Sequence, residues 1–224
     1  LLSNIMLNEL DKELEKRGLR FTRYADDCVI VVKSEKAANR VMESITKFIE
    51  KKLGLKVNVE KSKVARPHQI KYLGFGFYYT KTGIIKPKPH LKSIQKFKRK
   101  LKQLTKRSLS ISLDKRVIKL NQVIRGWINY FRIADMKTYM QSITSHLNRR
   151  IRCIIWKQWK VPKKRIERLR KLGCNEEQAK AIAYSRKKYW NSSLYISIFI
   201  TNKILKQIGL IFPIEHYQKV HTVI

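Results

Sequence analysis

Acidic residues are scarce in this chain. Its 224 residues include 51 Lys and Arg but only 16 Asp and Glu, which gives a formal net charge of +35 at pH 7. Residues 1–60 hold 12 basic and 10 acidic side chains, whereas residues 61–224 hold 39 basic and 6 acidic ones. Repulsion on this scale opposes folding unless a polyanion is nearby. The charge therefore predicts a nucleic-acid-binding protein whose binding weakens steeply as salt rises.

Other shortages exclude particular classes of protein. The three cysteines, Cys28, Cys153 and Cys174, lack the spacing of a zinc site, and their odd number argues against a disulfide framework. The longest apolar run, 194–200, is broken by Ser197 and is too short to cross a bilayer. The sequence has no signal-peptide pattern, so we expect an intracellular protein of a bacterial-type cytoplasm or an organelle, with no membrane partner.

Two adjacent carboxylates, Asp26 and Asp27, lie between a basic aromatic stretch, 21–24, and an apolar β-branched run, 28–32. Side chains alternate along a strand, but at a turn this alternation relaxes and a carboxylate can project outward. Mg²⁺ accepts one or two carboxylates together with substrate phosphates, and two such ions can stabilise phosphoryl transfer. Asp-Asp is also common in plain hairpin turns. With these flanks, we expect a metal-binding turn rather than a plain one.

The residues around this turn predict a mixture of helices and strands. Apolar spacing predicts a helix over 2–14, and Ser34 is placed to cap a second helix that ends at Gly54. Alternation over 55–59 predicts a strand, and 70–79 predicts another. A helix, a hairpin, a helix and further strands, with the acidic turn in the middle, form the layout of a polymerase palm.

The basic part of the chain is predicted to be helical. Apolar stripes predict three amphipathic helices, over 91–104, 117–131 and 136–154. The first stripe begins at Leu91. Their apolar faces are expected to bury one another in a bundle. Asn175 is placed to cap a shorter helix later in the chain.

Basic clusters recur in this part with almost no acidic neighbours, so we expect a phosphate-binding surface rather than ordinary solvated faces. The candidate RNA-binding residues are Lys98, Arg99, Lys100, Arg149, Arg150, Arg152, Lys163, Lys164, Arg165, Arg186, Lys187 and Lys188. Trp127, Trp156 and Trp159 lie at helical spacing and are expected in the core. Tyr189-Trp190 is expected in a polar loop, where the rings could stack on unpaired bases.

Seven segments of the chain and one single residue each match a motif of one known family. They are Leu1–Ile5, Tyr24–Asp27, Leu55–Lys63, Tyr72–Phe75, Arg125–Phe131, Ser185–Trp190, Gly209-Leu210 and Tyr217. The first four resemble the later reverse-transcriptase motifs of group II intron-encoded proteins. The others resemble the maturase-specific (thumb, or X) domain of that family and the short tail of members without an endonuclease.

The resemblance implies an α+β fold. A partial polymerase palm, an antiparallel sheet with helices, would precede an all-α thumb or maturase bundle. The implied domains are 1–86 for the C-terminal part of the palm, 87–190 for the thumb or maturase-specific domain, and 191–224 for a short C-terminal extension. Because the chain begins at Leu1 in mid-motif, we expect it to be the C-terminal part of a longer protein.

The resemblance also implies roles for individual residues. Asp26 and Asp27 match the metal-binding pair, which would hold Mg²⁺ or, as an alternative, Mn²⁺, and Lys61 matches a candidate general acid near the departing pyrophosphate. The residues implied to bind the nucleotide or the primer are Tyr24, Ala25, Tyr72, Leu73 and Gly74, and Arg125 joins the RNA-binding set. The implied partners are group II intron RNA, template RNA, a DNA primer and deoxynucleoside triphosphates.

Part of the family's site does not lie within residues 1–224. A further metal-binding aspartate on an earlier palm strand, and the fingers that cover the nucleotide, have no counterpart here. We therefore expect an RNA-directed DNA polymerase that also assists the splicing and mobility of its intron, with this chain inactive by itself. A non-catalytic RNA-binding maturase (a splicing factor) and a CRISPR-associated reverse transcriptase remain as alternatives. The intact pair Asp26-Asp27 favours the polymerase.

Overall fold

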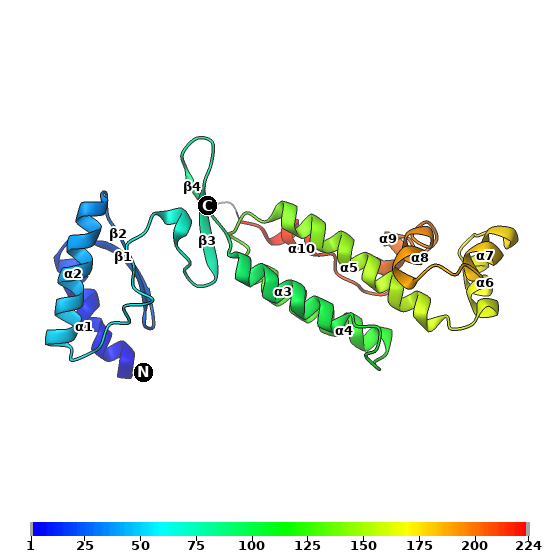
Figure 1. Cartoon of the computed structure of the whole chain (residues 1–224), viewed down its shortest axis with the longest axis horizontal. Helices are drawn as coiled ribbons and strands as arrows, with labels where there is room; N and C mark the ends of the chain where they lie inside the picture. The colour runs from blue at the N-terminus through cyan, green and yellow to red at the C-terminus, as the bar shows by residue number, and fades with distance from the viewer. Residues whose placement is uncertain (1, 223–224) are drawn as a thin grey trace. The chain divides into compact units, whose positions relative to one another are not determined.

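A computed structural model describes residues 2–222 of the chain, which fold as two compact units. The first unit ends at Ile85 and the second begins at Lys86. Figure 1 labels their helices and strands. In the first unit and at its border these are α1 (Leu2–Lys16), β1 (Arg20–Tyr24), β2 (Asp27–Val31), α2 (Glu35–Lys52), η1 (Pro67–Gln69), β3 (Phe75–Tyr79) and β4 (Ile85–Pro89). In the second unit they are α3 (Leu91–Leu104), α4 (Leu113–Tyr130), α5 (Lys137–Gln158), α6 (Pro162–Lys171), α7 (Glu176–Ala183), α8 (Tyr189–Tyr195), α9 (Asn202–Gln207) and α10 (Pro213–Val220).

The first unit is built around the hairpin β1–β2. Its core consists of Leu10 and Leu14 from α1 and Ile45 from α2, with Phe21 and Ile30 of the hairpin packed against them. Helix α2 begins as the sequence predicts, because the Ser34 side chain accepts a hydrogen bond from the Ala37 backbone N–H. The α+β fold class is confirmed, with two small antiparallel hairpins beside the helices.

Two expectations for this unit are wrong in detail. Residues 55–59 form no strand, since within residues 2–222 no neighbouring strand pairs with them. Instead the Leu55 amide bonds to the Ile49 carbonyl, and a turn at Asn58 leaves Val59 80% exposed. Of the expected strand over 70–79 only Phe75–Tyr79 forms, because the chain first reverses through a tight turn at Leu73-Gly74.

The three predicted long helices of the second unit are confirmed as α3, α4 and α5. Helix α3 packs on α4, and α10 packs against both α4 and α5 (Figure 1). The buried apolar side chains of these helices include Phe97, Leu120, Ile124, Leu147 and Ile151. Leu91 is an exception to the predicted stripe, because it opens α3 and remains 62% exposed.

Shorter helices complete this unit. Asn175 caps α7 as predicted, with its Oδ1 accepting from the Gln178 amide at 2.8 Å. Tyr189 and Trp190 were expected in a loop but form the first turn of α8, which packs on α5. Trp156 is in the core as predicted and is only 3% exposed. None of the helices in 2–222 is long and apolar enough to cross a membrane.

Candidate functional site

The acidic pair lies at the tip of the first hairpin. Tyr24 pairs with Asp27 at the end of the β1–β2 ladder, so Ala25 and Asp26 form a two-residue loop. Asp26 and Asp27 are both exposed, and within the described part of the chain neither forms an ion pair. Tyr24 beside them is 65% exposed. The hairpin therefore presents two carboxylates and a tyrosine ring to whatever binds there.

The Arg23 side chain links this loop to helix α1. Its Nε donates to Asp11 Oδ1 at 2.7 Å and its Nη2 to Asp11 Oδ2 at 2.5 Å, which ties β1 to helix α1. Its Nη1 donates to the Ala25 carbonyl at 2.8 Å and to Asn4 Oδ1 at 3.1 Å. The hydrogen bonds to Asp11, together with its negative charge, raise the pKa of Arg23. One guanidinium thus fixes the loop backbone to the scaffold.

The loop backbone is strained at its first residue. Ala25 has φ = 53°, and Asp26 is not among the residues of positive φ, which is the pattern of a type II′ turn. That position favours glycine, since a Cβ in the left-handed region costs roughly 1–2 kcal/mol. Strain of this kind is often retained where a loop must hold one conformation for function.

Two carboxylates can supply part of a metal site. Carboxylate oxygens are the hard donors that Mg²⁺ and Mn²⁺ accept, and Mg²⁺ needs few of them when substrate phosphates complete its shell. Over residues 2–222 no third His, Cys, Asp or Glu joins Asp26 and Asp27 in a cluster. The pair therefore fits a divalent cation that takes its other ligands from phosphates, water or another segment.

The other predicted palm residues lie in two turns. Tyr72 and Phe75 exchange backbone hydrogen bonds of 3.0 and 2.8 Å around Leu73 and Gly74, whose φ values are 47° and 82°. Two positive values in succession are the pattern of a type I′ turn, so Gly74 serves the turn itself as well as any close approach. Lys61 is exposed, with its amide bonded to Asn58 Oδ1 at 3.1 Å. No ion pair among the described residues joins Lys61 to the acidic pair.

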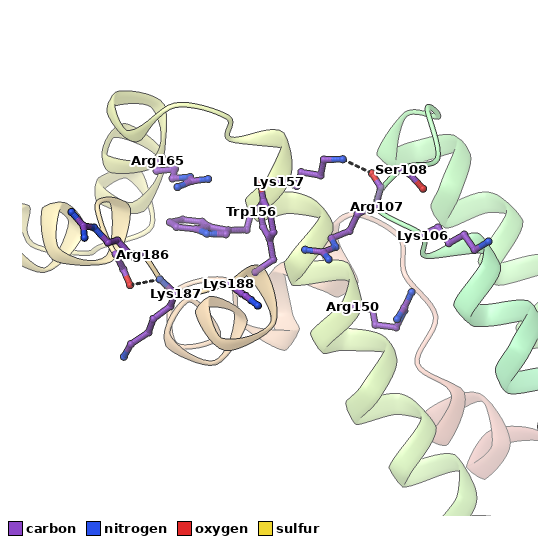
Figure 2. Close-up of a pocket in the computed structure, with 12 residues that line it drawn as sticks. Lys106, Arg107, Ser108, Arg150, Trp156, Lys157, Arg165, Arg186, Lys187 and Lys188 are labelled. Carbon is purple, nitrogen blue, oxygen red and sulfur yellow. Dashed lines mark hydrogen bonds between the residues drawn. The ribbon is translucent and has the colours of Figure 1, made fainter.

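A second candidate site is an open basic pocket in the second unit, with a volume of about 840 Å³. Twelve residues line it, of which eight are Lys or Arg and none is acidic. They come from the segment after α3, the C-terminal half of α5, the start of α6 and the segment before α8 (Figure 2). Five are predicted RNA-binding residues, namely Arg150, Arg165, Arg186, Lys187 and Lys188.

Sequence reasoning missed three cations of this pocket. Lys106 and Arg107 follow α3, and Lys157 lies seven residues after Arg150 on α5. Residues seven apart lie on one face of a helix, so the spacing of Arg150 and Lys157 is a signal that could have been used. The dipeptide Lys106-Arg107 carries no comparable signal, because only the folded chain brings it to α5.

A buried arginine shapes the rim of this pocket. Arg116 is only 2% exposed, and its guanidinium donates to the backbone carbonyls of Leu104, Lys106 and Leu109. Burial lowers its pKa, and within the described residues its Nε has no partner. Three carbonyls without a carboxylate are a costly environment for a cation. Their effect is to fix the backbone that carries Lys106 and Arg107.

Other predicted RNA-binding arginines hold helices together. Arg149 donates to Ser193 Oγ and the Trp190 carbonyl, and its guanidinium lies 3.9 Å from the centroid of the Trp190 ring. Arg152 donates to the Ile200 carbonyl and to Asn202 Oδ1. Arg149 thus attaches α8 to α5, and Arg152 attaches the segment after α8 to α5, so both have structural partners besides any contact with RNA.

The remaining predicted RNA-binding residues lie outside the pocket. All are exposed on helix surfaces, and they are Lys98, Arg99 and Lys100 on α3, Arg125 on α4, and Lys163 and Lys164 on α6. The structure thus gathers five of the predicted cations in one pocket and leaves these six elsewhere on the unit.

The pKa of His146 responds to the positive potential of this region. Its pKa is lowered by partial burial and by the charges of Arg150, Lys98, Arg149 and Lys102. The ring also packs against Trp190, with 5.3 Å between the ring centroids. Four nearby cations that add to the effect of burial on this pKa indicate a surface that favours an anion.

Comparisons with known proteins found two family models that match successive parts of the chain. Residues 1–77 match the family model for reverse transcriptase (RNA-dependent DNA polymerase), and residues 94–173 match that for the group II intron maturase-specific domain. The first match contains the acidic turn, and the second contains most of the pocket. A comparison with curated proteins found no match.

Proposed function

Because the chain belongs to the group II intron reverse transcriptase/maturase family, we propose that its acidic turn serves Mg²⁺-dependent RNA-directed DNA synthesis. The basic second unit carries the maturase-specific domain, which implies RNA binding. Intron RNA and template RNA, a DNA primer and deoxynucleoside triphosphates are its proposed partners. We propose the cytoplasm of a bacterial-type cell or an organelle as the site of this activity.

The observation that carries the proposal is the pair of exposed carboxylates at a loop fixed by Arg23. Phosphoryl transfer between nucleotides requires positioning and neutralisation of charge more than covalent help from the protein. Asp26 and Asp27 would hold the cation, which when bound would neutralise charge on the reacting phosphates. A carboxylate that is not engaged by a neighbouring cation is available for that role.

The residues around the pair have positioning roles in this proposal. Tyr24 offers an exposed ring beside the carboxylates, where the nucleotide or primer end would contact it. The tight turn at Leu73-Gly74 would approach the primer strand with its backbone. Lys61 is exposed and could donate a proton to departing pyrophosphate once substrate is bound.

Binding of Mn²⁺ tests the metal assignment directly. Paramagnetic Mn²⁺ added to the chain with a template–primer should broaden the NMR signals of residues next to the turn, such as Cys28. Asp26→Asn with Asp27→Asn should remove the broadening, whereas Asp114→Asn on α4 should leave it unchanged. Broadening that persists in the double variant would place the cation elsewhere. Intact RNA binding without any DNA synthesis by the natural protein would favour the non-catalytic maturase instead.

A further inference from the structure

The basic pocket of the second unit has features that favour one particular form of RNA. We infer that it binds the sugar–phosphate backbone of an unpaired RNA strand, with phosphates turned inward and bases outward. This inference rests on the proposed RNA-binding function and specifies the form of RNA that the pocket binds. It concerns the pocket alone and not the exposed lysines of α3 or α6.

Charge selects the class of ligand. Eight cations and no acidic side chain line a single concavity, and none of the eight forms an ion pair with another described residue. Arg107, Arg186 and Lys188 are exposed at its rim, where their charges are open to a ligand. Uncompensated positive charge gathered in this way favours phosphates, which release bound counterions when they are neutralised.

Shape distinguishes a single strand from a duplex. A pocket of about 840 Å³ has the size of a small-ligand site and can enclose a short stretch of one strand. Double-stranded RNA is recognised differently, by contacts spread along about 16 base pairs. Cations that converge from four segments of the chain fit a bent, flexible backbone better than a rigid rod.

The aromatic side chains of the pocket argue against recognition of bases. Trp156 is 3% exposed and is covered by Arg165, whose guanidinium carbon lies 4.6 Å from the ring centroid. Arg107 lies over the ring of Tyr189 in the same way, at 4.8 Å. Stacking on unpaired bases requires an open ring face. Here the rings orient guanidinium groups instead, so the pocket should bind phosphates with little dependence on base sequence.

The pocket is also organised before any ligand arrives. Arg150 donates to Thr105 Oγ1 at 2.5 Å and to the carbonyls of Lys102 and Thr105, each at 3.1 Å. Lys157 Nζ donates to the Arg107 carbonyl at 2.8 Å, as Figure 2 shows. These contacts join α5 to the segment after α3. Binding therefore avoids the entropy cost of ordering these two long side chains.

The test compares two triple variants of the full chain that remove equal charge. The pocket variant is Arg107→Gln, Arg186→Gln and Lys188→Gln, and the matched control is Lys98→Gln, Arg99→Gln and Lys100→Gln on α3. All six residues are exposed, so circular dichroism should show both variants folded. Fluorescence anisotropy measures their affinity for an unstructured single-stranded RNA, for a blunt RNA duplex of equal length and for ATP, over a series of salt concentrations.

The pocket variant should lose about 10- to 100-fold in affinity for the single strand, and the slope of log K against log salt should fall by about 2. Its affinity for the duplex should change less than about 3-fold, and the control should lose less single-strand affinity than the pocket variant. Equal losses in both variants, or equal losses on both RNAs, would overturn the inference. Loss of ATP binding with unchanged RNA binding would instead assign the pocket to a free nucleotide. Failure of the unaltered chain to bind any RNA would contradict the proposed function itself.

Discussion

Arg23 and Asp11 form a two-pronged ion pair between strand β1 and helix α1, with N–O distances of 2.7 and 2.5 Å. The remaining Nη1 of Arg23 reaches the Ala25 carbonyl inside the acidic loop. The loop that carries Asp26 is therefore attached to a helix through one side chain. Both partners are largely shielded from water, with 12% and 22% of their side-chain surfaces exposed.

The first prediction concerns this pair. Asp11→Asn should weaken the hairpin by about 1–3 kcal/mol, because a hydrogen bond between charged groups is lost while Arg23 stays largely shielded from water. The measurement is the free energy of opening of the β1–β2 amides by hydrogen exchange, since the two units need not unfold together. Glu9→Gln, which breaks the exposed pair with Lys12, is the matched control and should change little. Additive effects of Asp11→Asn and Arg23→Gln in a double-mutant cycle would show that the pair is not coupled.

A second prediction follows from the positive φ of Ala25. Ala25→Gly should stabilise the hairpin by up to about 1 kcal/mol, because relief of the left-handed strain exceeds the added entropy of the unfolded chain. Ala38→Gly in α2 is the control, and it should instead destabilise by about 0.5–1 kcal/mol. The same hydrogen-exchange measurement serves both variants. Destabilisation by Ala25→Gly would mean that the loop bears no strain.

The third prediction concerns pH. Burial and nearby cations hold the pKa of His146 below its ordinary value of 6.5 in the folded unit. A depressed histidine pKa means that the unfolded state binds protons more readily, so this contribution to stability is present above pH 6.5 and is lost as the pH falls below it. The second unit should therefore become less stable in mildly acidic solution, and His146→Gln should reduce that loss.

NMR titration of the ring checks the cause of the shift. Bound RNA neutralises Arg150 and its neighbours, so it should raise the pKa of His146 and should bind more tightly as the pH falls. His216 provides an internal comparison, because burial and the charges of Arg125 and Lys219 lower its pKa as well. A pKa of His146 at or above 6.5 without RNA would contradict the effect of burial and of the surrounding cations on this ring.

A fourth prediction concerns the chain by itself. Because no third metal-binding side chain clusters with Asp26 and Asp27 in residues 2–222, this chain should give little or no primer extension on an RNA template in the presence of Mg²⁺. It should nevertheless bind that template, since all eight cations of the basic pocket lie in the second unit. Robust synthesis by the isolated chain would show that two carboxylates suffice.

Local sequence patterns predicted most of the elements but not all of their ends. Helices α3, α4 and α5 follow from apolar spacing, and the β1–β2 hairpin follows from the strands on either side of Asp26. Alternation over 55–59 is present in the sequence, yet a strand also needs a partner for its backbone, and the folded chain supplies none in the described range.

The two candidate sites differ in how much of each the sequence could predict. The acidic pair is contiguous, so a single motif identifies it. The support of that pair by Asp11 is not local, because residues twelve apart meet only when α1 packs on the hairpin. The pocket likewise needs α5 to bring Lys157 beside the Arg107 carbonyl, fifty residues away in the sequence. Burial of Arg116 had no sequence signal, since charged residues are seldom buried without a carboxylate.

In the proposed function, Asp26 and Asp27 bind the metal of the reaction and are not needed to shape the turn. The most direct measurement compares primer extension and RNA affinity in the protein expressed from its natural reading frame, with and without Asp26→Asn and Asp27→Asn. We expect synthesis to fall at least about 1,000-fold while the dissociation constant for RNA changes less than about 3-fold. Parallel loss of synthesis and RNA binding, or synthesis that survives both substitutions, would contradict it.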